Sequence, residues 1–408
     1  MHTPFRILIS AVLLVLGWWT AYSSWPQRLI DAGGYTFSEE EARRLADYPA
    51  AQYAYGVQAW METQPEKAAT YFRRTVSEQV LALDAWLKLA EAEAAMGHAQ
   101  RAKEILAFTM ELTEQVFKWR WSQALLAREL AVEATFYRSI NDLLSRQTLV
   151  QDALQLLHTH LDGQTSTVIT ALEPAYLPAY LDWLMRWGMA EESGAVWQIM
   201  ASDAEVDKAT ALRYAHFLLS HKRIDAAVEI WRSATGTTGL TNPGFESDIS
   251  SQGFDWRYWG EKDGGWELKR THSESAEGDY ALRIDFKGAE NISFQHLYQI
   301  VPTPPGKAYR FSYRWKTRGI TTDQGPFVEI FSYDGQALYH KGDIMSATHD
   351  WQAGDITFTV PADCRATVVR LRRLPSMRFD SKIRGTLWLD DFRLEKIETN
   401  HRPGPKKL

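Results

Sequence analysis

Aromatic side chains beside polar turn residues are the feature of this sequence that most directly suggests binding chemistry. The chain has 17 tryptophans and 17 tyrosines among 408 residues, and an aromatic ring can stack on the apolar C–H face of a sugar. Neighbouring polar side chains would then bind the sugar hydroxyls. The residues predicted to form this saccharide platform are Trp259, Trp266, His296, Tyr298, Arg314 and Tyr333. For each aromatic ring, packing in the core or at a strand edge is the alternative.

No catalytic motif accompanies these residues. The sequence has no H-E-x-x-H, G-x-S-x-G or P-loop motif in a suitable context. His158 and His160 lie two residues apart in a predicted helical stretch, so they would face different sides and make a poor metal pair. The single cysteine, Cys364, excludes an internal disulfide, and the net charge of −6 argues against nucleic acid as a partner. A non-enzyme is therefore predicted.

The elements that would position the platform are β-strands. From residue 242 onward, apolar and polar residues alternate with a period of two, which is typical of half-buried strands. Turn sequences such as Glu277-Gly278-Asp279 and Asp334-Gly335 separate the alternating stretches. Strands are predicted at 281–286, 309–316, 356–360, 367–371 and 387–394. This spacing predicts a β-sandwich of jelly-roll type over residues 242–397.

Several strings in this half occur in the order expected of one known fold. They are N-P-G-F-E at 242–246, G-D-Y-A-L at 278–282, P-G-K-A-Y-R-F-S at 305–312, Trp351 with F-T-V-P at 358–361, and L-W-L-D-D-F-R-L at 387–394. Together they resemble the galactose-binding-like carbohydrate-binding modules, particularly the grouping with families four, nine and twenty-two. The resemblance implies an all-β sandwich, which serves sugar binding, protein contact or a structural role.

The same resemblance implies a structural calcium site. In such modules a carboxylate near the first strand and one on the last strand share the ion, and the matching positions are Glu246 with Asp390 or Asp391. Calcium takes six to eight oxygen ligands, so backbone carbonyls would have to converge there as well. The alternative is that Glu246 caps a turn or pairs with a cation, and that the two aspartates form turn or edge hydrogen bonds.

The first half of the chain is predicted to be helical and repetitive. Gly56 and Ala90, Ala68 and Ala102, and Phe72 and Leu106 are each 34 residues apart. These spacings resemble the tetratricopeptide repeat, with two units at 49–116, two at 174–241, and a degenerate unit plus an insertion at 117–173. The resemblance implies an all-α right-handed superhelix whose groove binds a protein partner.

The N-terminus carries an apolar run at residues 7–22, with Arg6 before it and aromatic residues at its far end. This pattern predicts an uncleaved signal anchor, with a cleaved signal peptide as the alternative. The predicted location is the inner membrane, with the bulk of the chain in the periplasm. The predicted organisation is a cytoplasmic start and transmembrane helix at 1–25, a linker and first helix at 26–48, helical repeats at 49–235, a linker at 236–241, the sandwich at 242–397 and a disordered basic tail at 398–408.

These features predict a multidomain, membrane-anchored scaffold. Its helical repeats would dock a protein partner, its sandwich would bind a polysaccharide, and it would serve bacterial surface-polysaccharide assembly or export. The sequence leaves two alternatives open. In the first, the chain is a protein–protein assembly factor with a structural sandwich. In the second, it is an accessory subunit that presents polysaccharide to a separate enzyme.

Overall fold

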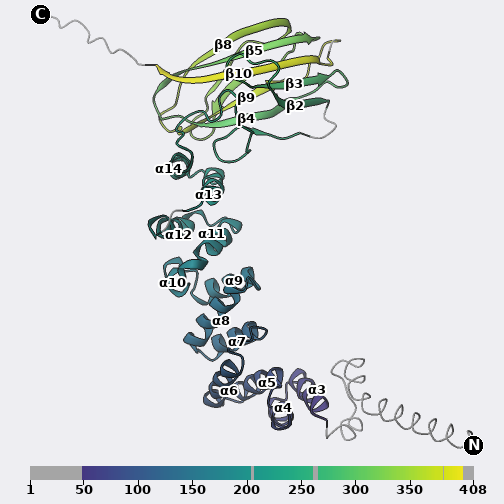
Figure 1. The fold of residues 1–408 in the computed structure, drawn as a ribbon, viewed down its shortest axis with the longest axis vertical. Helices are drawn as coiled ribbons and strands as arrows, with labels where there is room; N and C mark the ends of the chain where they lie inside the picture. Colours follow the sequence, from purple (N-terminus) through teal and green to yellow (C-terminus); the bar gives the residue numbers. More distant parts are fainter. Residues whose placement is uncertain (1–47, 204–205, 261–264, 380, 398–408) are drawn as a thin grey trace, which may run out of the picture. The chain divides into compact units, whose positions relative to one another are not determined.

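A computed structural model describes residues 48–203, 206–260, 265–379 and 381–397, which form two compact units (Figure 1). The first unit extends to Trp183 and includes Ala195–Trp197, and the second contains Leu184–Gly194 and the chain from Gln198 onward. The predicted signal anchor and the basic tail lie outside the described residues. Within those residues, every helix is too short or too polar to cross a bilayer.

Helices occupy the described chain as far as residue 235. They are α3 (Pro49–Met61), α4 (Pro65–Glu78), α5 (Leu83–Ala95), α6 (Ala99–Leu112), α7 (Arg120–Glu129), α8 (Glu133–Ser145), α9 (Val150–His160), α10 (Thr165–Ala171), the 3₁₀ turn η1 (Pro174–Tyr176), α11 (Leu177–Arg186), α12 (Ala190–Asp203), α13 (Lys208–Ser220) and α14 (Ile224–Thr235).

Small residues allow the helices of the first unit to pack closely, as their 34-residue spacing predicts. A Cβ atom added to Gly56 on α3 would lie 2.5 Å from Cε1 of Phe72 on α4, so only glycine permits this approach. Ala68, Ala90 and Ala102 are fully buried. The predicted helical pairs are therefore confirmed, while their identity as tetratricopeptide repeats stays a prediction.

For the stretch at 117–173, the sequence predicts one degenerate unit plus an insertion. The structure instead has four helices there, α7 to α10, which continue the helical pattern of the preceding residues. The break at Asp162 and Gly163 is the turn between α9 and α10, where both residues have positive φ angles of 51° and 73°. The repeat motif is lost here, but the apolar spacing that forms helices is kept.

Two antiparallel five-stranded sheets form the β-sandwich of the second unit (Figure 1). Sheet A has the order β1-β4-β9-β6-β7, and sheet B has the order β2-β3-β10-β5-β8. The strands are β1 (Arg257–Tyr258), β2 (Trp266–Thr271), β3 (Ala281–Lys287), β4 (Phe294–Pro302), β5 (Ala308–Ile320), β6 (Phe327–Ser332), β7 (Tyr339–Lys341), β8 (Ala347–Thr359), β9 (Ala366–Arg373) and β10 (Arg384–Ile397). Each predicted strand lies within or overlaps one of them.

The core between the sheets determines which side chains face outward. Leu297, Leu371 and Val328 are paired across β4, β9 and β6, and all three belong to the buried core cluster. Because side chains alternate along a strand, the next residues on these strands point to the opposite side of sheet A. We call this side the outer face of sheet A, and the corresponding side of the second sheet the outer face of sheet B.

Helices α13 and α14 belong to the same compact unit as the sandwich. Trp231 of α14 packs against Gly253, where an added Cβ would lie 2.3 Å from the indole ring. The backbone N–H of Gly253 donates to Nδ1 of His216 at 3.1 Å. The boundary between the two compact units therefore falls within α11, at Trp183 and Leu184. The linker predicted at 236–241 follows the end of α14 at Thr235 and lies inside the second unit.

Candidate saccharide-binding face

A row of polar and aromatic side chains crosses all five strands of sheet A. The register pairs Arg257 with Tyr298, Tyr298 with Arg370, Arg370 with Glu329, and Glu329 with Lys341. Residues paired in this way project from the same face of an antiparallel sheet. Four strand spacings of about 4.8 Å make the row roughly 19 Å long. A row of this length is suited to an extended chain ligand.

The centre of the row is an ordered ion pair. Arg370 contacts Oε1 of Glu329 through both Nε and Nη2 at 2.6 Å, and the hydroxyl of Tyr339 donates to the other carboxylate oxygen at 3.1 Å. Glu329 is only 3% exposed although it projects from the outer face. The guanidinium of Arg370 also lies 4.5 Å from the ring centre of Phe331. These contacts fix donors and acceptors in place before any ligand arrives.

Four of the predicted platform residues lie together at the β1–β4 edge. The ring of Trp259 contacts those of His296 and Tyr298 at centroid distances of 5.5 and 5.4 Å, and His296 lies 5.0 Å from Trp266. Trp259 is 49% exposed and can offer its ring to a ligand. Trp266 is only 7% exposed and belongs to the core, so its expected exposure is wrong.

Tyr333 lies elsewhere, between the sandwich and helix α13. Its hydroxyl donates to the carbonyl of Leu219 at 2.9 Å, and its own carbonyl accepts from Nζ of Lys222 at 2.8 Å. The same ammonium group lies 3.2 Å from the centre of the ring. Burial raises the pKa of Tyr333 above its ordinary value. The ring of Tyr333 therefore packs against the helical hairpin formed by α13 and α14. The neighbouring sequence Asp334-Gly335 predicts a turn and gives no indication of this contact.

Arg314 lies on β5 in sheet B, apart from the aromatic edge of sheet A. Its neighbours on that outer face form a ladder of ion pairs. Lys316 contacts Glu274 at 2.9 Å and Asp350 at 3.0 Å, and Arg283 contacts Asp285 at 2.8 Å. Arg314 as a saccharide ligand stays a prediction, but it does not join the other candidates.

The carboxylates predicted to hold calcium divide into a pair and a single residue. Oε1 of Glu246 and Oδ1 of Asp390 each lie 3.6 Å from the position that a Cβ on Gly244 would take, so they flank one turn. Asp391 instead accepts from Nε of Arg393 at 2.6 Å. Among the described residues, no three acidic, histidine or cysteine side chains form a metal-binding group. Of the three predicted carboxylates, only Glu246 and Asp390 therefore lie at the same turn, whereas Asp391 is paired with Arg393.

Backbone N–H groups already hold both members of that pair. Those of Asp279 and Tyr280 donate to Glu246, and those of Ala276 and Glu277 donate to Oδ2 of Asp390. Asp390 is fully buried, and its burial raises its pKa above the ordinary value. These bonds match the alternative that the sequence left open, in which the carboxylates hold turns.

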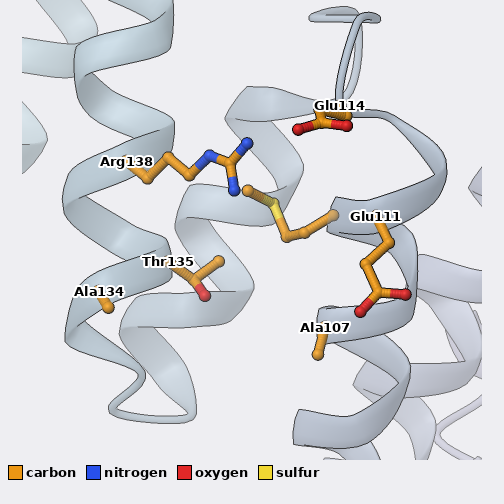
Figure 2. Close-up of a pocket in the computed structure, with 7 residues that line it drawn as sticks. Ala107, Glu111, Glu114, Ala134, Thr135 and Arg138 are labelled. Carbon is orange, nitrogen blue, oxygen red and sulfur yellow. The ribbon is translucent and has the colours of Figure 1, made fainter.

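The helical half offers a separate groove between α6 and α8, with a volume of about 380 Å³. Met110 and Ala107 line it together with Glu111, Glu114 and Arg138, and Figure 2 shows Arg138 extending from α8 toward the wall formed by Glu111 and Glu114. The groove lies within the first unit and has charged rims around an apolar side chain.

The sequence analysis did not predict several outer-face residues of sheet A. They lie on short strands with little alternation, so no local pattern indicates them; they are Arg257, Glu329, Tyr339 and Lys341. Arg370 and Arg372 flank the buried Leu371 on β9, so both alternate with an apolar residue. The sequence does not reveal which strands lie beside β9, and this pairing is what assembles the row.

No protein-family model matches this chain, and no curated protein matches it. Among solved structures, the sandwich resembles carbohydrate-binding modules. The CBM22-1 xylan-binding domain from Paenibacillus barcinonensis is 14% identical, with 38% of this chain and 92% of that chain covered and a TM-score of 0.27.

Two further modules are similar to the same part of the chain. A family 61 module, solved with β-1,4-galactotriose, is 19% identical over 40% of this chain and 99% of that one, with a TM-score of 0.27. A family 4 module is 20% identical over 39% of this chain and 99% of that one, also at 0.27. At 14–20% identity, these likenesses concern the fold alone.

Proposed function

We propose that this protein binds a polysaccharide, without cleaving it, on the outer face of sheet A. The main support for this proposal is the row of side chains from Arg257 to Lys341. Exposed aromatic rings lie beside this row, and the Arg370–Glu329 ion pair is already formed at its centre. Chain polysaccharides present alternating apolar faces and hydroxyl groups, so they require this mixture of rings and hydrogen-bonding groups.

Each part of the face has a distinct role in this proposal. Trp259 and Tyr298 stack on sugar rings at one edge, and Tyr339, which is 58% exposed, does so near the other. Arg370 donates to sugar oxygens while Glu329 holds its guanidinium in one orientation. Because this pair is ordered before binding, little side-chain entropy is lost when the ligand arrives.

The proposal is tested by titrating the full chain with neutral and acidic polysaccharides in affinity electrophoresis. We expect retardation by at least one polymer and its loss in the Trp259→Ala/Tyr298→Ala double variant. The Trp351→Ala variant is the matched control, because Trp351 is a partly exposed tryptophan on β8 of sheet B. Equal retardation of the double variant and the wild type would place the site elsewhere.

A calcium ion held by Glu246 and Asp390 is a separate proposal, and its role would be structural. When bound, it would neutralise two adjacent carboxylates and join the turn at Gly244 to strand β10. We expect chelation to lower the melting temperature of the wild type by several degrees and to leave the Glu246→Gln variant unchanged. An identical melting temperature of the wild type with chelator and with added calcium would exclude the ion.

The partner and location of the chain are proposed from the sequence pattern and the α6–α8 groove. A partner protein would place an apolar side chain against Met110, and the apolar run at 7–22 would anchor the assembly in the inner membrane. Such a scaffold would act in surface-polysaccharide assembly or export. A reporter that is active only in the periplasm, fused to the C-terminus, tests the orientation, and a silent fusion at normal expression would contradict it.

A further inference from the structure

The five strands of sheet A contain an uneven set of charges. Their carboxylates comprise Glu329 alone, whereas their cations include Arg257, Arg370, Arg372 and Lys341 on the outer face. Arg370 is neutralised by Glu329. The strands of this sheet therefore carry three outer-face cations that Glu329 does not neutralise, although the whole chain has a net charge of −6.

Within the described residues, the contacts of these three cations leave their charge uncompensated. Arg372 donates through Nη1 to the hydroxyl of Ser293, the carbonyl of Phe294 and the amide oxygen of Gln295, which are all neutral. Lys341 lies 5.3 Å from the ring centre of Phe327. Its register neighbour Glu329 is already bound by Arg370 and Tyr339. In the part of the chain that the structure describes, neither cation has a carboxylate within ion-pair distance.

Arg257 is the most constrained of the three. Its Nη2 donates to the carbonyl of Gly253 at 2.5 Å, and its guanidinium lies 5.8 Å from the ring centre of Tyr298. Its Nε is buried and has no hydrogen-bond partner among the described residues. The contacts with Gly253 and Tyr298 hold the guanidinium in one orientation.

We propose that the polysaccharide bound by sheet A carries carboxylate groups, as a polyuronate does, and that Arg257, Arg372 and Lys341 recognise them. This inference rests on the proposed function, because it names the chemical class of the ligand for the same face. Guanidinium groups bind carboxylates with paired, charge-assisted hydrogen bonds, and the spread of the three cations over the sheet matches charges repeated along a polymer.

The test compares a polyuronate with the same polymer after its carboxyl groups have been reduced to alcohols. Polygalacturonate, alginate and their reduced forms are titrated against the full chain in low and high salt. We expect the acidic form to bind roughly tenfold more tightly in low salt, and this advantage to shrink as salt screens the charges. Equal or weaker binding of the acidic forms would overturn the inference.

Variants connect the preference to these side chains. Arg257→Ala, Arg372→Ala and Lys341→Ala together should remove the acidic advantage while binding of the reduced polymer persists. Lys269→Ala, a partly exposed lysine of β2 in sheet B, is the control and should keep the full advantage. Should the triple variant not fold, Lys341→Ala alone should reduce the advantage measurably, because Lys341 is exposed at the sheet edge.

The outcomes separate this inference from the proposed function. Binding of neutral polymers only, such as xylan or the reduced forms, would refute the acidic ligand and keep saccharide binding on sheet A. Failure of every polymer to bind would contradict both. An acidic preference that survives in the triple variant would show that other cations are responsible.

Discussion

The outer faces of the two sheets use the same residue types in different ways. On sheet B, cations and carboxylates alternate and neutralise one another, as in the Lys316 contacts with Glu274 and Asp350. On sheet A, Arg370 and Glu329 form one central ion pair. The cations around this pair have no carboxylate partner among the described residues. The number of charged residues therefore does not distinguish the two faces, whereas the cations without carboxylate partners beside exposed rings do.

Trp388 illustrates the same difference for aromatic rings. Leu387 and Leu389 face the core, so the tryptophan between them projects from the outer face of sheet B. It is nevertheless only 2% exposed, because Arg283 and Arg318 cover its ring at 5.5 and 5.3 Å. Trp259 on the other sheet remains half exposed. Trp388 is therefore covered on the outer face of sheet B, whereas Trp259 beside sheet A stays accessible.

The largest expected effect comes from removing that covered ring. Trp388→Ala should lower the free energy of unfolding by about 3–5 kcal/mol, because a large buried side chain is lost. The melting temperature should fall by roughly 6–15 °C, and saccharide binding at low temperature should be unchanged. Thermal unfolding measures the first effect. A loss of binding in folded Trp388→Ala protein would argue that sheet B also takes part.

The second largest effect is expected from breaking the Arg370–Glu329 ion pair on sheet A. Arg370→Met should destabilise the fold by about 3 kcal/mol, since it leaves the nearly buried Glu329 without its cation. On sheet B, Arg310→Met breaks an exposed pair with Asp355 and should cost at most about 1 kcal/mol. Urea unfolding of the two variants gives the comparison. Equal destabilisation would mean that the Arg370–Glu329 pair is no more than a surface ion pair.

A smaller effect is expected from single aromatic substitutions at the site. Tyr298→Ala should weaken polysaccharide binding by roughly tenfold, because truncation of a central aromatic contact costs at least about 1.4 kcal/mol. Its effect on stability should be modest, as the ring lies outside the core cluster. Calorimetric titration with the best polymer measures the change. Unaltered affinity would remove Tyr298 from the binding face.

The smallest effect concerns the pH dependence of the ladder on sheet B. Burial alone would raise the pKa of Asp285, but the hydrogen bonds from Arg283 and Thr386 and the nearby cations outweigh it, so the pKa lies below the ordinary value of 3.8. A lowered carboxyl pKa stabilises the fold above the unfolded value, and this stability is lost as the pH falls through the folded value.

The variant Asp285→Asn should therefore be less stable than the wild type by about 2 °C at neutral pH. This difference should disappear as the pH approaches 3 and below. Melting curves between pH 2 and 7 test the window. A difference that grows with acidification would contradict the sign of the shift.

Much of the fold followed from local sequence. Alternation in strands such as β5 and β10 predicted the sandwich, and the spacing of Gly56, Ala68 and Phe72 predicted the close helical pairs. These signals are local because they reflect the periods of single elements. The pairing of strands that are far apart in sequence is not local, and it determines which residues become neighbours on a face.

The candidate site was accordingly predicted in part. Trp259, His296 and Tyr298 do lie together, because Trp259 directly follows the edge strand β1 and the other two lie on β4, which pairs with β1. Trp266 became core and Tyr333 became a helix contact, since burial depends on what packs above each ring. Glu329 and Tyr339 were missed because only the register brings them to Arg370.

Hydroxyl-radical footprinting with saturating polysaccharide is the sharpest test of saccharide binding on sheet A, because it reports which side chains the ligand covers. We expect slower modification of Trp259, Tyr298 and Tyr339 on sheet A. Trp351 on sheet B and the fully exposed Met377 should react at their unliganded rates. Protection of Trp351, with the three sheet A rings unprotected, would contradict the assignment of the binding face.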